Sequence, residues 1–195
     1  MIKKIAAAGV MAGAMLFSPV VGQAAMGDET LRQGMWDQDI HELQAKLKAL
    51  GYFNYKATTG YYGSVTKDAV TKFQRAKGLK VDGIAGPQTF SAINNSSFQK
   101  RSFSVEATAY TAECEGCSGT TANGTNLKET PYAKMIAVDP NVIPLNSVVY
   151  VEGYGYAVAG DTGGGIDGNE IDIYKQEHED AVNWGRRTVK ITVIN

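Results

Sequence analysis

Two aspartates, Asp161 and Asp172, flank a glycine-rich stretch that is the strongest candidate for chemistry in this sequence. Three adjacent glycines at 163–165 offer no side chain to pack, and a fold that keeps them usually brings a ligand or another backbone close to the chain. Residues 171–174 then alternate apolar and polar, which predicts a strand with Asp172 and Tyr174 on one face and two isoleucines on the other. Asp-Thr-Gly and Asp-Gly are also ordinary turn sequences whose carboxylates accept backbone N–H bonds. The spacing alone therefore leaves a catalytic acid and a simple turn as alternatives.

Composition and charge indicate a globular chain and argue against a nucleic-acid partner. The 195 residues have room for one large domain or two small ones. The formal net charge is −1, and removal of residues 1–24, which hold Lys3 and Lys4 but no acid, would leave −3. Because phosphate binding requires clustered Lys and Arg, we expect no nucleic-acid partner. We also expect a monomer without a cofactor.

Residues 1–24 have the pattern of a secretory signal peptide. Lys3 and Lys4 form a positive end, residues 5–17 form an apolar run, and residues 22–24 form a small-x-small cleavage site. The run is too short to span a membrane, which takes about 20 apolar residues. The sequence therefore predicts a secreted protein that keeps no membrane segment once the signal is removed.

The region 33–94 has the periodicity of three short helices. Apolar residues at steps of three and four predict a first helix over 36–50, ended by Gly51, with a buried face of Trp36, Ile40, Leu43, Leu47 and Leu50. A second helix, capped by Ser64 or Thr66, would bury Val65, Ala69, Val70 and Phe73. After a tight turn at Asp82-Gly83, Pro87 suits the first turn of a third helix.

This helical region resembles the peptidoglycan-binding domain 1 family, a three-helix module that targets the cell wall. The resemblance rests on Asp39-Ile40, Leu43-Gln44, Leu50-Gly51-Tyr52-Phe53, Thr59-Gly60-Tyr61-Tyr62-Gly63, Ala69-Val70, Phe73-Gln74, Val81-Asp82-Gly83 and Gly86-Pro87-Gln88-Thr89. It implies peptidoglycan as the partner. Within the module, the expected exposed glycan contacts are Tyr61, Tyr62 and the turn at Asp82, because aromatic faces suit sugar rings.

The remainder of the chain has the composition and pattern of a small β domain. Residues 95–102 are polar and aperiodic, which predicts a linker. Residues 103–195 contain six short runs rich in Val, Ile, Thr and Tyr, which predict strands at 103–110, 135–138, 147–151, 156–159, 171–174 and 188–194. One helix is expected at 175–184. Six short strands favour a closed barrel, so we predict an α + β chain of two domains.

Several motifs of this β domain together resemble the 3D domain, which is named for three aspartates. They are Ala107-Thr108-Ala109-Tyr110, Thr121-Ala122-Asn123-Gly124, Ile136-Ala137-Val138-Asp139-Pro140, Ile143-Pro144-Leu145, Asp161-Thr162-Gly163-Gly164 and Ile171-Asp172-Ile173-Tyr174. The three acids correspond to Asp139, Asp161 and Asp172. Proteins with this domain are similar to the catalytic barrel of membrane-bound lytic transglycosylase A, which implies a six-stranded double-psi β-barrel. Most of that enzyme's large accessory domain has no counterpart here, so the contacts that bind the substrate can differ.

The resemblance implies a secreted cell-wall enzyme that cleaves peptidoglycan glycan strands as a lytic transglycosylase. Asp172 would be the acid and then the base, while Asp161 and Asp139 would raise its pKa, position it or stabilise positive charge. Thr162, Gly163 and Gly164 would border the sugar. Tyr174 would contact the sugar or an acid, or else be a buried tyrosine of the barrel.

Other interpretations are less well supported by the sequence. Asp161-Thr162-Gly163 also matches the aspartic-protease triplet, but that site needs two such loops. Cys114 and Cys117 have the spacing of half a zinc site, yet the sequence holds no other cysteine, so a short-loop disulfide or two free thiols is expected rather than a metal. A non-catalytic expansin-like or wall-binding protein remains the alternative to an enzyme.

Overall fold

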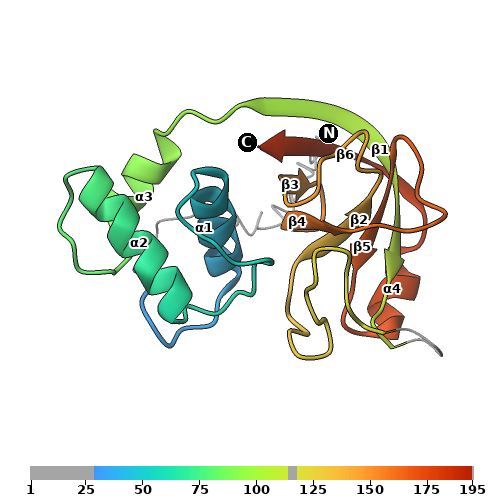
Figure 1. Ribbon diagram of the computed structural model, residues 1–195, viewed down its shortest axis with the longest axis horizontal. Coiled ribbons are helices and arrows are strands. Elements are labelled where there is room, and N and C mark those ends of the chain that lie inside the picture. Colours follow the sequence, from blue (N-terminus) through green and yellow to red (C-terminus); the bar gives the residue numbers. More distant parts are fainter. Residues whose placement is uncertain (1–28, 114–117, 195) are drawn as a thin grey trace, which may run out of the picture.

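The computed structural model describes residues 29–113 and 118–194, which form a helical module followed by a closed barrel (Figure 1). The predicted signal peptide and both cysteines lie outside the described residues. The elements in chain order are α1 Gln38–Ala49, α2 Ser64–Ala76, α3 Pro87–Asn94, β1 Lys100–Tyr110, β2 Met135–Val138, β3 Val148–Val151, β4 Gly155–Asp161, β5 Glu170–Tyr174, α4 His178–Trp184 and β6 Arg187–Ile194. In the part of the chain described, no helix has the length and apolarity needed to cross a membrane.

The module packs its three helices around one apolar core. Asp37 caps α1 by accepting a bond from the Asp39 N–H at 2.7 Å, and Gly51 follows the helix with φ +79. Pro87 occupies the first turn of α3. The core consists chiefly of Ile40, Leu43, Leu47, Ala69, Val70, Phe73, Phe90 and Ile93. Most of the predicted helical faces are thereby confirmed, together with the stop at Gly51.

Three predictions for the helices of the module are wrong. Trp36 is 59% exposed, because α1 begins two residues later and Trp36 lies in an extended segment that bridges to Tyr61. Val65 is 43% exposed, since it lies at the solvent-facing start of α2. Neither Ser64 nor Thr66 caps α2: the cap is Gly63, which has no side chain to bond, and Thr66 is buried.

Two buried glutamines, Gln44 on α1 and Gln74 on α2, hold two turns in the same manner. Each amide group donates to the carbonyl of the third turn residue and to a threonine on the next helix, while each amide oxygen accepts from the first two turn N–H groups. The partners of Gln44 are Tyr61 O (2.8 Å), Thr66 Oγ1 (2.9 Å), Thr59 N (2.7 Å) and Gly60 N (3.3 Å). Those of Gln74 are Ile84 O (2.9 Å), Thr89 Oγ1 (3.1 Å), Asp82 N (3.2 Å) and Gly83 N (2.9 Å). The module is therefore an internal repeat of a helix, a glutamine-held turn and a second helix.

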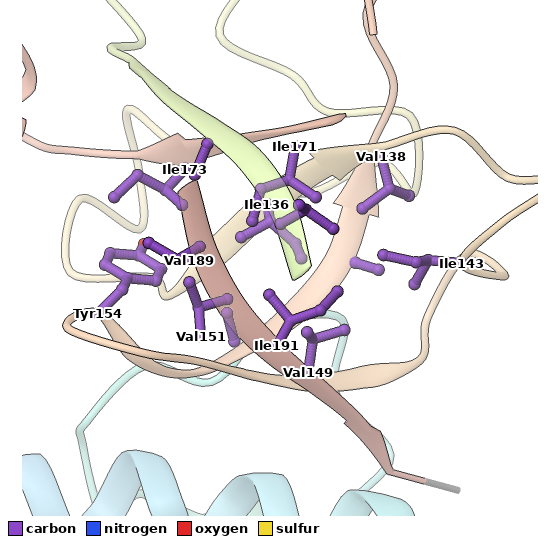
Figure 2. Packing of buried hydrophobic residues seen from close by; sticks show 14 of the residues in the cluster. Ile136, Val138, Ile143, Val149, Val151, Tyr154, Ile171, Ile173, Val189 and Ile191 are labelled. Carbon is purple, nitrogen blue, oxygen red and sulfur yellow. The ribbon is translucent and has the colours of Figure 1, made fainter. Parts of the chain in front are cut away.

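The barrel closes in the strand order β1-β5-β2-β4-β3-β6. The pairs β1–β5 and β2–β4 are parallel and the others are antiparallel. Figure 2 shows the side chains that fill the interior, among them Ile136, Val149, Val151, Ile171, Ile173 and Ile191. The predicted six strands and the closed barrel are confirmed, whereas the double-psi connection stays a prediction.

The segment predicted as a linker over 95–102 is shorter in the structure. Strand β1 begins at Lys100, whose partner is Ile194 of β6, so residues 100–102 belong to the barrel. Phe98 packs against a small cluster of Ala45, Val148 and Ile194, which includes residues of both domains. The polar composition concealed this pairing because the first part of β1 is exposed to solvent.

The module is docked on the barrel, with α1 as its nearest helix (Figure 1). Ala57, in the loop after α1, is fully buried in a barrel cluster that contains Met135. The Lys134 N–H donates to the Thr58 carbonyl at 3.0 Å, and the Asn123 side-chain amide donates to the Lys56 carbonyl at 3.0 Å. The two domains therefore share a packed and hydrogen-bonded boundary.

Candidate active site

Asp161 and Asp172 lie on one row that runs across four strands of the barrel wall. Ala137 of β2 is in register with Asp172 of β5 on one side and with Asp161 of β4 on the other. Asp172 is also in register with Thr108 of β1. Ile171 and Ile173, the neighbours of Asp172 along β5, are buried in the core. Since strand side chains alternate between faces, the row of acids faces away from the core, as the sequence predicted for Asp172.

A bulge at Gly160 brings Asp161 onto this row. The register passes from Ile136 opposite Ala159 directly to Ala137 opposite Asp161, so Gly160 is the extra residue. Ala159 points into the core, and strict alternation would turn Asp161 to the same side. The extra residue reverses that orientation, which is a common effect of bulges near functional sites.

Replacement of Gly160 by Ala is expected to lower the free energy of unfolding by about 1–3 kcal/mol through overpacking. A Cβ at this position would lie 2.1 Å from Met135 Sδ and 2.6 Å from Asn123 Nδ2. Met135 is fully buried and has little room to move aside. Denaturant unfolding measures the effect, and Gly164→Ala is the matched control because nothing lies within 4 Å of its added Cβ. Equal stability of the two variants would contradict the role of Gly160.

The carboxylate of Asp161 is held by three donors. Its Oδ1 accepts from the N–H groups of Ala122 and Thr162, both at 2.9 Å, and its Oδ2 accepts from the Tyr110 hydroxyl at 3.2 Å. Burial, followed by the charge of Asp161, raises the pKa of Tyr110 far above its ordinary value. The phenol therefore stays protonated and keeps donating, which fixes the orientation of Asp161.

The environment of Asp172 favours the protonated form of its carboxyl group. It is half-buried, and burial is the main cause that raises its pKa above the ordinary value, with the charge of Asp161 adding to the effect. A bond from Thr108 Oγ1 to Asp172 Oδ1 at 3.1 Å acts in the opposite direction and lowers the pKa. A raised pKa makes a carboxyl group better able to donate a proton and then take one back.

The third aspartate, Asp139, holds a turn. Its Oδ1 accepts from the Asn141 N–H at 2.9 Å, and its Oδ2 accepts from the Gly168 N–H at 3.0 Å. These bonds, that of Asn141 first, lower the pKa of Asp139 itself. The charge that raises the pKa of Asp172 comes from Asp161. Asp139 therefore fixes the turn that leads into β5, and the roles expected of it toward Asp172 stay predictions.

A groove of about 280 Å³ lies beside Asp172. The residues that line it are Glu106, Thr108, Gly163, Gly165, Ile166, Glu170, Ile171, Asp172 and Arg186. Arg186 and Glu106 form an ion pair on its border. Gly163 thus borders the groove as expected, while Thr162 and Gly164 are exposed but do not line it. No three His, Cys, Asp or Glu side chains are grouped for a metal within residues 29–113 and 118–194.

Tyr174 is buried in the barrel wall, with 4% of its surface exposed. It is in register with Tyr110, and the two ring centroids lie 5.7 Å apart. Of the two roles considered for Tyr174, the buried tyrosine is the one observed. Its edge also lines a larger cleft between the domains.

The three residues of the module that were expected to contact glycan differ in exposure and in role. Tyr62 is fully buried and its hydroxyl donates to the Gly83 carbonyl at 2.9 Å, so the prediction of an exposed ring is wrong. Its backbone bonds to Gly34 and Met35 turn the side chain into the core. Asp82 accepts from the Ile84 N–H at 2.9 Å and stabilises its own turn. Tyr61 is 38% exposed and presents an aromatic face.

Two further exposed aromatic residues lie beside Tyr61 and were not predicted from the sequence as glycan contacts. Trp36 and Tyr132 are 59% and 58% exposed. The Trp36 ring lies 4.7 Å from that of Tyr61 and 5.4 Å from that of Tyr132, measured between centroids. We refer to Trp36, Tyr61 and Tyr132 as the aromatic patch. Asp37, a typical N-cap residue, was the signal that could have placed Trp36 outside the helix.

Comparisons with known proteins agree with both resemblances. A family model described as a putative peptidoglycan binding domain matches residues 37–93, and the 3D domain model matches residues 134–195. The putative cell wall shaping protein YabE of Bacillus subtilis (strain 168) is 51% identical over 130 residues, which cover 67% of this chain and 30% of that protein. The cell wall-binding protein YocH of the same organism is 56% identical over 105 residues, which cover 54% of this chain and 36% of that protein.

A crystal structure of MltA from E. coli matches 31% of this chain and 23% of its own at 23% identity, with a TM-score of 0.27. The chain spans about a third of the length of YabE and YocH. The two family matches fall on the two parts of the fold, the helices at 37–93 and the barrel strands within 134–195. The chain therefore joins a putative peptidoglycan binding domain to a 3D domain.

Proposed function

We propose that this chain is a secreted cell-wall enzyme that cleaves the glycan strand of peptidoglycan as a lytic transglycosylase. The observation that carries the proposal is Asp172, a half-buried carboxyl group with a raised pKa beside a groove and a second, firmly held acid. The putative peptidoglycan binding domain and the cell-wall relatives support the substrate. The proposal includes the double-psi connection of the barrel that the 3D resemblance implies.

In the proposed reaction, Asp172 protonates the glycosidic oxygen that leaves, and the bond after N-acetylmuramic acid breaks. The 6-hydroxyl of the same sugar then attacks its anomeric carbon and passes its proton to the Asp172 carboxylate, which yields a 1,6-anhydro ring. A single carboxyl group thus serves as acid and then as base, a role worth about 10²–10⁴ in rate. Asp161, fixed by three donors, stabilises positive charge on the ring and raises the pKa of Asp172.

A second candidate function is wall binding without cleavage. It is favoured by the name of YocH, a cell wall-binding protein, and by the exposed aromatic patch. Wall binding without cleavage gives the raised pKa of Asp172 no function.

Mass spectrometry of peptidoglycan digested with the purified protein distinguishes these functions. A transglycosylase leaves anhydro-muramic ends, a hydrolase leaves reducing muramic ends, and a binding protein leaves the glycan intact. We expect anhydro-muramic ends. Reducing ends, or no product under conditions where the protein binds the wall, would contradict the proposal.

Two substitutions are expected to move the alkaline limb of the pH profile of kcat/KM in opposite directions. Activity needs protonated Asp172, so it falls as the pH rises through the pKa of this group. Asp161→Asn removes a negative charge that raises this pKa, so the limb moves to lower pH. Thr108→Val removes a hydrogen bond that lowers it, so the limb moves to higher pH. The pH dependence of anhydro-muropeptide release measures both shifts, and a limb unmoved in either variant would count against Asp172 as the titrating acid.

A further inference from the structure

A cleft of about 760 Å³ lies at one side of the boundary between the helical module and the barrel. Residues of both domains line it, among them Trp36 and Gly60 of the module and Tyr132, Lys134 and Tyr174 of the barrel. The aromatic patch borders this cleft on one side and a second hollow, of about 450 Å³, on the other. Trp36 and Tyr132 line both hollows. The patch is therefore a ridge of aromatic rings between two open spaces.

The rings of the patch are held in place although they are exposed. Trp36 forms a β-bridge with Tyr61, and the Tyr61 carbonyl accepts from Gln44 at 2.8 Å. Tyr132 comes from the barrel, in the loop just before the bond between Lys134 and Thr58. Trp36 is thus placed between a ring of its own domain and a ring of the other. Because these contacts exist before any ligand binds, little ordering is needed to use the surface.

The cleft adjoins the acids along β5. Tyr174 lines the cleft and follows Asp172 by two residues on the same face, so their Cα atoms lie roughly 6.6 Å apart at about 3.3 Å per residue. Tyr110, in register with Tyr174, donates to Asp161. The groove and the cleft share no lining residue, so β5, with Asp172 at the groove and the largely buried Tyr174 at the cleft, is the element that connects them.

The chemistry of the patch suits a carbohydrate chain. Rigid aromatic faces next to polar groups pack against the C–H faces of sugar rings, while the neighbouring polar groups bond the hydroxyls. An extended glycan whose scissile bond lies at Asp172 would cross β5 to reach the cleft. A protein partner is the competing occupant, but it would have no need for a cleft lined by the same strand, β5, that carries the acid at the groove.

We propose that the aromatic patch is a sugar-binding subsite for the peptidoglycan glycan strand, assembled only when the module and the barrel are docked. The path of the strand rests on the function proposed for Asp172, whereas the binding of sugar at the patch does not. The subsite holds sugars some distance from the cleaved bond.

Tryptophan fluorescence can report this binding directly. The sequence contains two tryptophans, and Trp36 is 59% exposed whereas Trp184 is 7% exposed. Soluble glycan strands released from peptidoglycan by an amidase are titrated into the full chain carrying Asp172→Asn, which prevents turnover. We expect a saturable change in fluorescence. Its loss is expected when Trp36 is replaced by Phe.

Isothermal calorimetry with the same strands then separates the patch from the rest of the surface. Tyr132→Ala and Trp36→Ala are each expected to raise Kd about tenfold or more, which corresponds to about 1.4 kcal/mol. Tyr150→Ala is the matched control. Tyr150 is also exposed (40%), and its ring also lies near another, Tyr156, at 5.0 Å, but it lines neither the cleft nor the groove. Its Kd is expected to stay within about twofold of the parent.

The outcomes separate this proposal from the proposed function. Unchanged Kd in both patch variants, with thermal unfolding like that of the parent, would overturn the subsite even if the wild type makes anhydro-muramic products. Weakened binding in the patch variants would support the subsite even if the wild type makes no product. Absence of glycan binding by the parent protein would also overturn the subsite and leave a protein as the occupant.

Discussion

Asp172→Asn is expected to lower the release of anhydro-muropeptides by about 10² or more while the protein remains folded. The asparagine amide keeps the shape of the side chain, and its oxygen can still accept the bond that Thr108 donates at 3.1 Å. It has no proton to transfer at any working pH. Because the raised pKa of Asp172 reflects a cost of burying its charge, the neutral amide is not expected to reduce stability.

Product release by the purified variant, with circular dichroism to check folding, tests this expectation. Glu179→Gln on α4 is the control, because it makes the same carboxylate-to-amide change at an exposed position outside the groove. The control should retain wild-type activity, and both proteins should bind insoluble peptidoglycan. Release near the wild-type rate by folded Asp172→Asn protein would move the acid role to Asp161 or Asp139.

Gln44→Ala is expected to lower the free energy of unfolding by about 3 kcal/mol and to weaken glycan binding. The side chain is 1% exposed, and its loss leaves the Thr59 and Gly60 N–H groups and the Tyr61 carbonyl without these bonds. A buried group deprived of its partner costs about 1–3 kcal/mol. The loosened turn carries Tyr61, so the aromatic patch should lose its arrangement.

Gln74→Ala provides a matched comparison within the same module. Gln74 is 2% exposed and holds the equivalent turn at Asp82, Gly83 and Ile84, which does not line the cleft. Denaturant unfolding should show a similar loss of stability, while calorimetry well below both unfolding temperatures should show a Kd close to that of the parent. If both variants lose binding equally, the effect of Gln44 on the patch would be a general effect of instability.

Much of the secondary structure was predictable because hydrophobic spacing reflects burial. Strand β2 matches the predicted 135–138, where every residue is buried, and β5 differs from its prediction by the single residue Glu170. The errors had two causes: an apolar period that continued past the end of a helix, and a pair of neighbours that was taken to face the same way. Trp36 fits the period of α1 but precedes its N-cap, and Tyr62 was grouped with its exposed neighbour although the chain alternates there.

The candidate site was predictable in its residues but not in its geometry. The alternation of 171–174 placed Asp172 outward, yet its pairing with Asp161 depends on the register of three strands and on the bulge at Gly160. The steric reason for that glycine is Met135, which lies 25 residues earlier in the chain. The aromatic patch combines rings from two domains, and no local pattern records that proximity.

The pairing of β1 with β5 and β6 constrains the order in which the chain can fold during its synthesis. The contacts of the module join helices that follow one another, so it can form once residue 94 has left the ribosome. Strand β1 follows at once, but both of its partners lie beyond residue 169. At about 5–20 residues per second, its edges stay without their native partners for roughly 4–15 s. A nascent chain would thus carry a finished helical module beside an open strand, and this interval is when mispairing between chains is most easily started.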